Sequence, residues 1–132
     1  MALNLRSLAL AIASAAILSP ALAQDAAACG AATTQLQMNQ CARDALATAD
    51  AEMNRLYRKQ MSAIDTERKK RLQASQRAWL KYRDSACLYE TGPRAQSGSI
   101  WPMQVALCQA AFTRERNETL RKYAACRQDW CR

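Results

Sequence analysis

The stretch Leu72–Cys87 holds the chain's densest group of side chains that could bind or catalyse. Gln76 and Arg83 are seven residues apart and would share one helix face with Trp79. A guanidinium on an otherwise apolar face needs acceptors, because a buried unpaired charge is costly. The nearby acceptors are Asp84, Asn54 or a backbone carbonyl. A binding subsite is one interpretation, and we favour the other, a polar network that fixes how helices pack and that also includes Arg116.

Acid–base catalysis would need residues that this sequence largely lacks. It contains no histidine, so a glycosidase-like mechanism would require a pair of carboxylates, drawn from Asp50, Glu52, Asp84 and Glu90. Asp50 and Glu52 are two residues apart and would not face each other on a helix. Without histidine or a C-x-x-C pair, a metal site is not indicated either. We therefore expect neither enzymatic activity, nor a metal, nor a cofactor.

Three aromatic residues could instead stack against a sugar ring. These are Trp79, Tyr82 and Trp101. Trp79 lies on the inner helix face and is expected in the core. Trp101 flanks a predicted loop, where core and surface positions are equally consistent with the pattern.

Two long helices must position these residues, since neither glycine nor proline occurs between Thr34 and Thr91. We expect a break at residues 63–66, with Asp65 as N-cap of a second helix over 66–89 and Glu67 in its first turn. Asp50 should face water or a helix edge. The inner face of the first helix is predicted to consist of Met38, Cys41, Ala45, Ala49, Met53, Leu56 and Gln60.

A third helix is predicted after the glycine- and proline-rich stretch Thr91–Ser99, which should be a loop. It should begin at Trp101, with Pro102 in the first turn, where a missing N–H matters least. Its inner face is predicted to consist of Met103, Ala106, Ala110, Thr113, Asn117, Leu120 and Ala124. The expected fold is all-α: a small three-helix bundle, made of a helical hairpin and a third helix and stapled by disulfides.

The first 23 residues have the pattern of a cleaved signal peptide. Arg6 precedes the apolar run Leu8–Leu18, which is too short to span a bilayer, and Ala21–Ala23 offers a cleavage site of small residues. We expect cleavage after Ala23, one mature domain over 24–132 that does not span the membrane, and a periplasmic or secreted location.

Six cysteines lie in the mature region: Cys29, Cys41, Cys87, Cys108, Cys126 and Cys131. An even number after an export signal predicts three disulfides, which could be connected in any of 15 ways.

The net charge of +8 falls to about +7 when Arg6 is removed with the signal peptide. A basic exported protein can meet an anionic envelope component, whereas nucleic acid is not an expected partner in that compartment. The simpler interpretation is that lysine and arginine alternate with acids on solvated helix faces.

Five motifs in order resemble the bacterial LprI-like family of small secreted helical proteins, named for a lysozyme inhibitor. They are Cys29-x11-Cys41; Asp50-x-x-Met53-Asn54-x-x-Tyr57; the Q-R-A-W-L-x-Y-R-D-x-x-C run of 76–87; Gly98–Pro102; and Cys108 with Thr113-x-x-Arg116. On this resemblance the structural motif consists of Asp50, Asn54, Tyr57, Gln76, Trp79, Arg83, Asp84 and Arg116. The resemblance also implies the disulfides Cys29–Cys41 and Cys87–Cys108, while Cys126 and Cys131 look like an added pair.

The resemblance implies a binding protein without enzymatic activity that inhibits a lysozyme or other muramidase by occupying its sugar cleft. Its candidate interface, chosen from exposure and composition, is Arg94, Ser97, Gly98, Ser99 and Trp101. Many lysozymes are cationic, so a basic inhibitor would meet repulsion. The alternative is an envelope protein that binds an anionic surface component or a partner protein without inhibiting anything.

Overall fold

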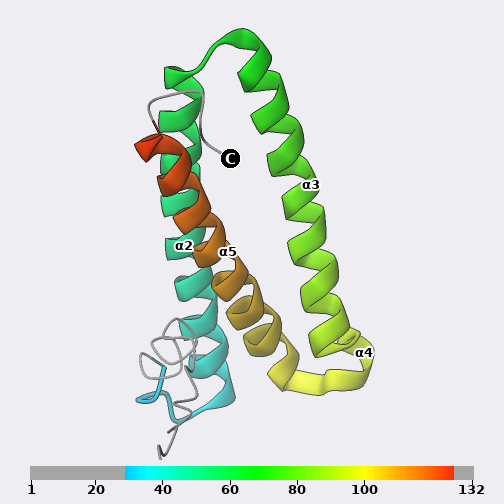
Figure 1. Ribbon diagram of the computed structural model, residues 1–132. Coiled ribbons are helices and arrows are strands. Elements are labelled where there is room, and N and C mark those ends of the chain that lie inside the picture. The colour runs from blue at the N-terminus through cyan, green and yellow to red at the C-terminus, as the bar shows by residue number, and fades with distance from the viewer. Residues whose placement is uncertain (1–28, 127–132) are drawn as a thin grey trace, which may run out of the picture.

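The computed structural model describes residues 29–126, and three long helices dominate them (Figure 1). The elements in order are α2 (Gln35–Ala63), α3 (Thr66–Thr91), the short α4 (Arg94–Ser97), the 3-10 turn η1 (Gly98–Ile100) and α5 (Trp101–Ala125). No strand occurs in this part of the chain. The predicted all-α fold, a helical hairpin followed by a third helix, is confirmed.

The two helices of the hairpin begin at capping residues. The Thr34 hydroxyl accepts a hydrogen bond from the Gln37 backbone N–H, and the Gln37 side chain accepts one from the Thr34 N–H in return. Asp65 caps α3 as predicted, and its carboxylate accepts from the Arg68 N–H at 2.9 Å. These caps satisfy backbone donors that a helix start otherwise leaves unpaired.

The loop predicted over residues 91–99 is partly wrong, because most of this stretch is helical. Gly92 ends α3 with φ of 68°, a backbone conformation that favours glycine. α4 then begins after Pro93, and Gly98, with φ of 63°, opens η1. The turn residues therefore redirect the chain at two points, and the residues between them form short helical turns.

α2 and α5 pack directly against each other through small residues (Figure 1). Ala42 and Ala49 of α2 are buried, as are Ala106 and Ala110 of α5. Small side chains let helix backbones approach closely at high packing density. The predicted inner face of α5 is correct over its central residues. That of α2 is rotated, since Ala42 and Asn39 are buried, whereas Met38, Cys41, Ala45 and Gln60 are only half-buried.

α3 stands apart from α2 and approaches α5, so longer side chains must close the gap (Figure 1). Leu72 joins Met53, Leu56 and the fully buried Leu120 in an apolar cluster at the hairpin end. Trp79 packs against the same cluster but stays half-buried. Beyond this cluster, α3 contacts the other two helices through polar side chains, through Tyr82, whose ring lies edge-on to Phe112 of α5 at 5.8 Å, and through the Cys87–Cys108 disulfide.

Both disulfides with described partners lie at the end of the molecule opposite the α2–α3 turn. Cys29–Cys41 fastens the residues before α2 to that helix, and Cys87–Cys108 joins the end of α3 to α5. These are the two pairs that the family resemblance implies. The third expected pair includes Cys131, which lies outside the described residues, as does the expected signal peptide. Within residues 29–126, no helix is both long and apolar enough to cross a membrane.

Candidate functional site

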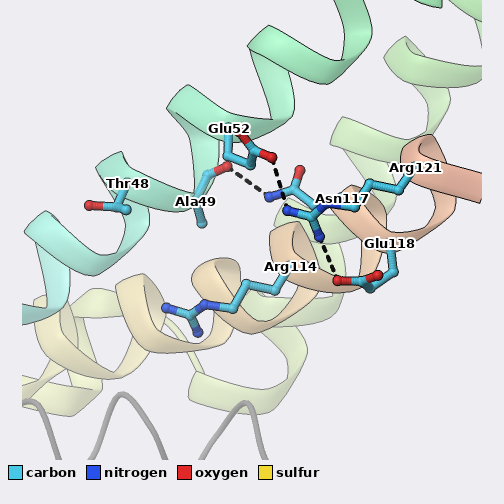
Figure 2. Close-up of a pocket in the computed structure, with 7 residues that line it drawn as sticks. All are labelled: Thr48, Ala49, Glu52, Arg114, Asn117, Glu118 and Arg121. Atoms are coloured by element: carbon cyan, nitrogen blue, oxygen red, sulfur yellow. Dashed lines mark hydrogen bonds and ion pairs between the residues drawn. The ribbon is translucent and has the colours of Figure 1, made fainter. Parts of the chain in front are cut away.

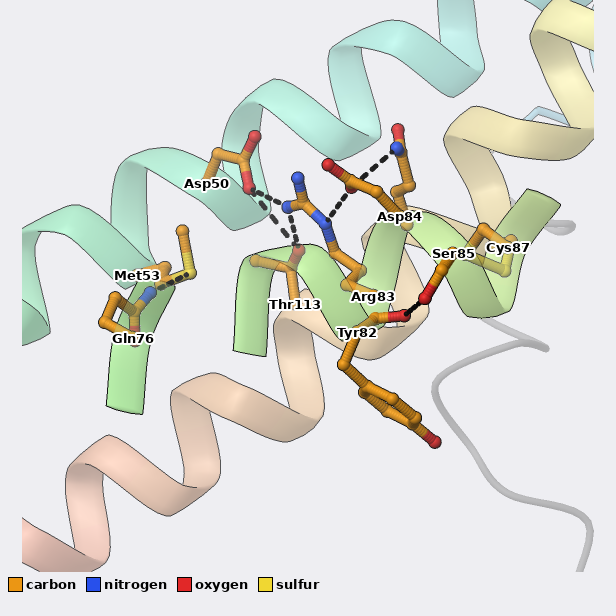
Figure 3. Close-up of polar contacts among 11 residues, drawn as sticks. Asp50, Met53, Gln76, Tyr82, Arg83, Asp84, Ser85, Cys87 and Thr113 are labelled. Atoms are coloured by element: carbon orange, nitrogen blue, oxygen red, sulfur yellow. Dashed lines mark hydrogen bonds and ion pairs between the residues drawn. A yellow bond between two sulfur atoms is a disulfide. The ribbon is translucent and has the colours of Figure 1, made fainter. Parts of the chain in front are cut away.

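Arg83 is the centre of a polar layer between the three helices (Figure 3). Its side chain is only 10% exposed. It donates to Asp84 at 2.9 Å, to Asp50 of α2 at 3.0 Å and to Thr113 of α5 at 3.0 Å. Gln109 also donates to Asp84, at 3.0 Å. The guanidinium therefore binds acceptors on all three long helices, as a buried cation requires.

A second set of polar contacts lies one to two turns closer to the hairpin end. Arg116 of α5 donates to the Gln76 side chain at 3.0 Å and to Ser75 at 3.3 Å. Gln76 in turn contacts the Met53 sulfur at 3.2 Å (Figure 3). The guanidinium carbons of Arg83 and Arg116 lie 5.4 and 5.8 Å from the Trp79 ring centroid. Trp79, which is half-buried, thus has two guanidiniums within cation–π range.

This layer supports the structural interpretation of the motif residues. Asp50 lies half-buried at a helix edge, bound to Arg83. Asn54 is exposed and plays no part in the layer, whereas Tyr57 packs against the apolar cluster. Sequence reasoning missed Thr113 as a partner of Arg83. It also missed Asn39, which donates to the Ser99 carbonyl at 3.1 Å and ties α2 to η1.

The candidate interface in residues 94–101 is held in place by its own hydrogen bonds. Trp101 donates from Nε1 to the Gly92 carbonyl at 2.8 Å and is half-buried. Ser97 donates to the Thr91 and Pro93 carbonyls. Arg94, Gly98 and Ser99 are exposed. The segment is therefore a fixed surface, and Arg94 is its one charged side chain.

Exposed apolar side chains lie within this segment and in the helices next to it, and sequence reasoning did not select them. Tyr89 is 90% exposed, Leu36 73%, Leu88 51% and Ile100 39%. We call this part of the molecule, residues 29–48 and 87–108, the stapled end, because it holds both disulfides. Its only charged residues are Arg43, Asp44, Glu90 and Arg94, so its net charge is zero. The sequence could have indicated that Leu36, Leu88 and Tyr89 are exposed, because these residues fall outside the predicted inner faces of their helices.

A shallow pocket of about 240 Å³ lies between α2 and α5 (Figure 2). Arg121 crosses it to Glu52 at 2.9 Å, and Asn117 donates to the Ala49 carbonyl at 3.1 Å. Hydrogen bonds from Arg55 and Arg121 lower the pKa of Glu52 from 4.5 to about 2, against partial desolvation. A carboxyl held ionised in this way is unsuited to act as a general acid at neutral pH. The lining residues are Thr48, Ala49, Glu52, Arg114, Asn117, Glu118 and Arg121.

The described residues contain no group of three histidine, cysteine or acidic side chains placed to hold a metal ion. None of their cysteines is a free thiol. The described residues thus form an internally bonded helical domain whose stapled end has no net charge and exposes several apolar and aromatic side chains.

Comparison with known proteins places this domain in a family. Residues 26–120 match the family model described as "Lysozyme inhibitor LprI". The chain is also 36% identical, over 107 residues, to an uncharacterised protein of Rhizobium meliloti (strain 1021). That match covers 71% of this chain and 76% of the relative. No solved structure matches the chain. The matched region includes both described disulfides and the whole polar layer.

Proposed function

The chain belongs to the lysozyme inhibitor LprI family, and from this premise we propose that it inhibits a lysozyme or related muramidase by occupying the sugar cleft. The observation that carries the proposal is the family match over residues 26–120. The described disulfides are typical of proteins that work outside the cytoplasm. In this role the protein is a binding partner without catalytic activity of its own.

The stapled end is the surface that we propose for this contact. Protein interfaces are enriched in tyrosine and arginine and poor in lysine and glutamate at their centre. Tyr89 and Arg94 provide such side chains, and Arg94 can face the acidic residues of a muramidase cleft. Cys87–Cys108 and the Trp101–Gly92 hydrogen bond hold the surrounding backbone in place, which reduces the entropy lost on binding.

The position of the charges removes the objection that two basic proteins repel each other. The stapled end has no net charge. The excess of cations lies toward the other end of α2, a helix of 29 residues and hence about 43 Å long. Charges are screened over about 8 Å at physiological ionic strength. A cationic lysozyme docked on the stapled end would therefore meet little of the net charge.

A lysis assay with the purified mature protein and several types of lysozyme tests the proposal. We expect inhibition of at least one type, and a loss of about tenfold or more in affinity when a central interface residue is replaced, as in Tyr89→Ser or Arg94→Glu. Arg58→Ala, at the opposite end, is the matched control and should inhibit normally. If micromolar protein inhibits none of the lysozymes, the function is wrong. If it inhibits but both stapled-end variants are as active as the control, the contact surface is wrong.

Export is part of the same proposal. We propose that residues 1–23 direct secretion and are removed after Ala23, which places the mature domain in the periplasm or outside the cell. The mass of the protein recovered from the producing cell tests this directly. A mature chain that begins at Gln24 is the expected result, and an intact chain retained in the cytoplasm would contradict it.

A further inference from the structure

The positive charge of the domain is concentrated at the end opposite the disulfides. We call residues 55–78 of the α2–α3 hairpin and 114–125 of α5 the basic end. It holds twelve of the sixteen lysine and arginine residues of the described chain but only four of its nine acidic residues. The hairpin turn and the C-terminal half of α5 lie toward the same end of the molecule (Figure 1). Folding therefore collects charge that is scattered along the sequence.

Many of these cations have no carboxylate partner within the described residues. Ion pairs occupy Arg55, Arg68, Lys70 and Arg121 at this end. By contrast, no carboxylate of the described chain pairs with Arg58, Lys59, Lys69, Arg71, Arg77 or Lys122. The fold thus leaves a group of cations that neither its packing nor its ion pairs use.

The placement of these cations also costs stability. Four successive basic residues, 68–71, lie in the first turns of α3, at the positive end of the helix dipole. The only acidic residues near them are Asp65, the cap, and Glu67. A surface that needed only solubility would place cations at helix C-termini instead. An external partner with negative charge would offset this cost.

We propose that the basic end docks onto the surface of a bilayer that contains anionic phospholipids. Its unpaired cations belong to three helices, and none of them lines the pocket between α2 and α5. An extended layer of headgroup phosphates fits several dispersed cations better than a shaped cleft does. Lysine and arginine near such a surface add attraction with each charge, within one Debye length.

This orientation holds the protein peripherally, with the stapled end pointing away from the membrane. No described helix is long and apolar enough to span the bilayer, so attachment would be electrostatic and reversible. The inference does not rest on lysozyme inhibition, because it uses different residues at the opposite end. It adds a location to the proposed activity: a muramidase would be met about 40 Å above the lipid surface, the length of α2.

Vesicle sedimentation of the purified mature protein tests the inference. The probes are phosphatidylcholine vesicles with and without phosphatidylglycerol. We expect binding only to the anionic vesicles, and a loss of about tenfold or more when salt is raised well above the physiological level. The variant Lys59→Glu/Arg71→Glu should lose about tenfold or more in vesicle affinity. The control Arg43→Glu/Lys81→Glu makes the same change in net charge outside the basic end and should lose much less.

Three outcomes would overturn the inference. They are equal binding to neutral vesicles, equal losses in the two double variants, and binding to soluble polyphosphate without binding to anionic vesicles. Helical content by circular dichroism shows that each variant folds, as expected for substitutions at exposed positions. Lysozyme inhibition should be unchanged in the Lys59→Glu/Arg71→Glu variant, so a failure of vesicle binding is separable from a failure of inhibition.

Discussion

At the residue scale, Arg83 shows how far one sequence defines a polar network. Its position on an apolar helix face predicted that it needs acceptors, and Asp84, one of the acceptors considered, is among those it binds. Asn54, another of them, is exposed, and the cross-helix acceptor from α2 is Asp50 instead. Periodicity gives the approximate inner face of a helix but not its exact rotation against a neighbour. For α2 that rotation depends on the close alanine contacts with α5, which only the fold reveals.

We predict that Arg83→Ala lowers the free energy of unfolding by about 3 kcal/mol, because it removes the ion pairs with Asp50 and Asp84 and the hydrogen bond to the buried Thr113. The value lies at the low end of the range for buried ion pairs because solvent reaches both carboxylates. Urea denaturation measures the change. Arg77→Ala, on the exposed face of the same helix, is the control and should change stability by less than about 0.5 kcal/mol. Similar losses in the two variants would show that Arg83 is not a packing centre.

Glu52 gives a prediction for the dependence of stability on pH. Its pKa is lowered to about 2 in the folded protein, mainly by the hydrogen bond from Arg55, with Arg121 adding to it. A lowered pKa contributes stability above the unfolded pKa, near 4.5, and that contribution disappears as the pH falls toward 2. The stability difference between the wild type and Glu52→Gln should therefore be greatest above pH 4.5 and shrink below it. Denaturation curves at several pH values measure this, and a pH-independent difference would contradict the assigned ion pairs.

At the scale of elements, the helix starts and the break at residues 63–66 were predictable, whereas the connection between α3 and α5 was not. Asp65 and Trp101-Pro102 mark the beginnings of α3 and α5 because capping and the missing proline N–H act locally. The stretch 91–99 was predicted as a loop from its glycine and proline content. Those residues do bend the chain, but Ser97 and Trp101 bond back to carbonyls at the end of α3 and just beyond it. These hydrogen bonds join residues six and nine positions apart, and composition alone does not predict them.

The Asp65 cap is open to a direct test. Asp65→Ala removes the acceptor for the Arg68 N–H and should lower the free energy of unfolding by about 1 kcal/mol. Asp65→Ser or Asp65→Asn keeps an acceptor at the same position and should recover most of the loss. Thermal melting of the three variants measures the effect. The same hydrogen bond from the Arg68 N–H lowers the pKa of Asp65 and so favours its charged form. Equal destabilisation by all three variants would therefore show that the charge of Asp65 stabilises α3, and not its position as an acceptor.

At the scale of the whole molecule, the two ends differ in net charge, and this difference was not predicted from the sequence. A net charge of +8 is a single sum and suggested repulsion from any cationic target. The fold separates that charge from the neutral stapled end by placing the C-terminal half of α5 beside the α2–α3 hairpin (Figure 1). The family and the all-α class were accessible from motifs. The uneven distribution of charge between the two ends could not be predicted without knowing which helices lie together.

The separation of α3 from α2 has a consequence for motion. α3 is tethered at both ends, by the two-residue turn to α2 and by Cys87–Cys108 to α5, and polar side chains hold most of its middle. If that layer opens, the helix stays nearby at high effective concentration and recloses quickly. Such opening would escape a cooperative melting curve but would appear in native-state hydrogen exchange. Backbone amides in the middle of α3 should exchange faster than those where α2 and α5 pack together. Local opening would then be confined to the α3 side of the molecule.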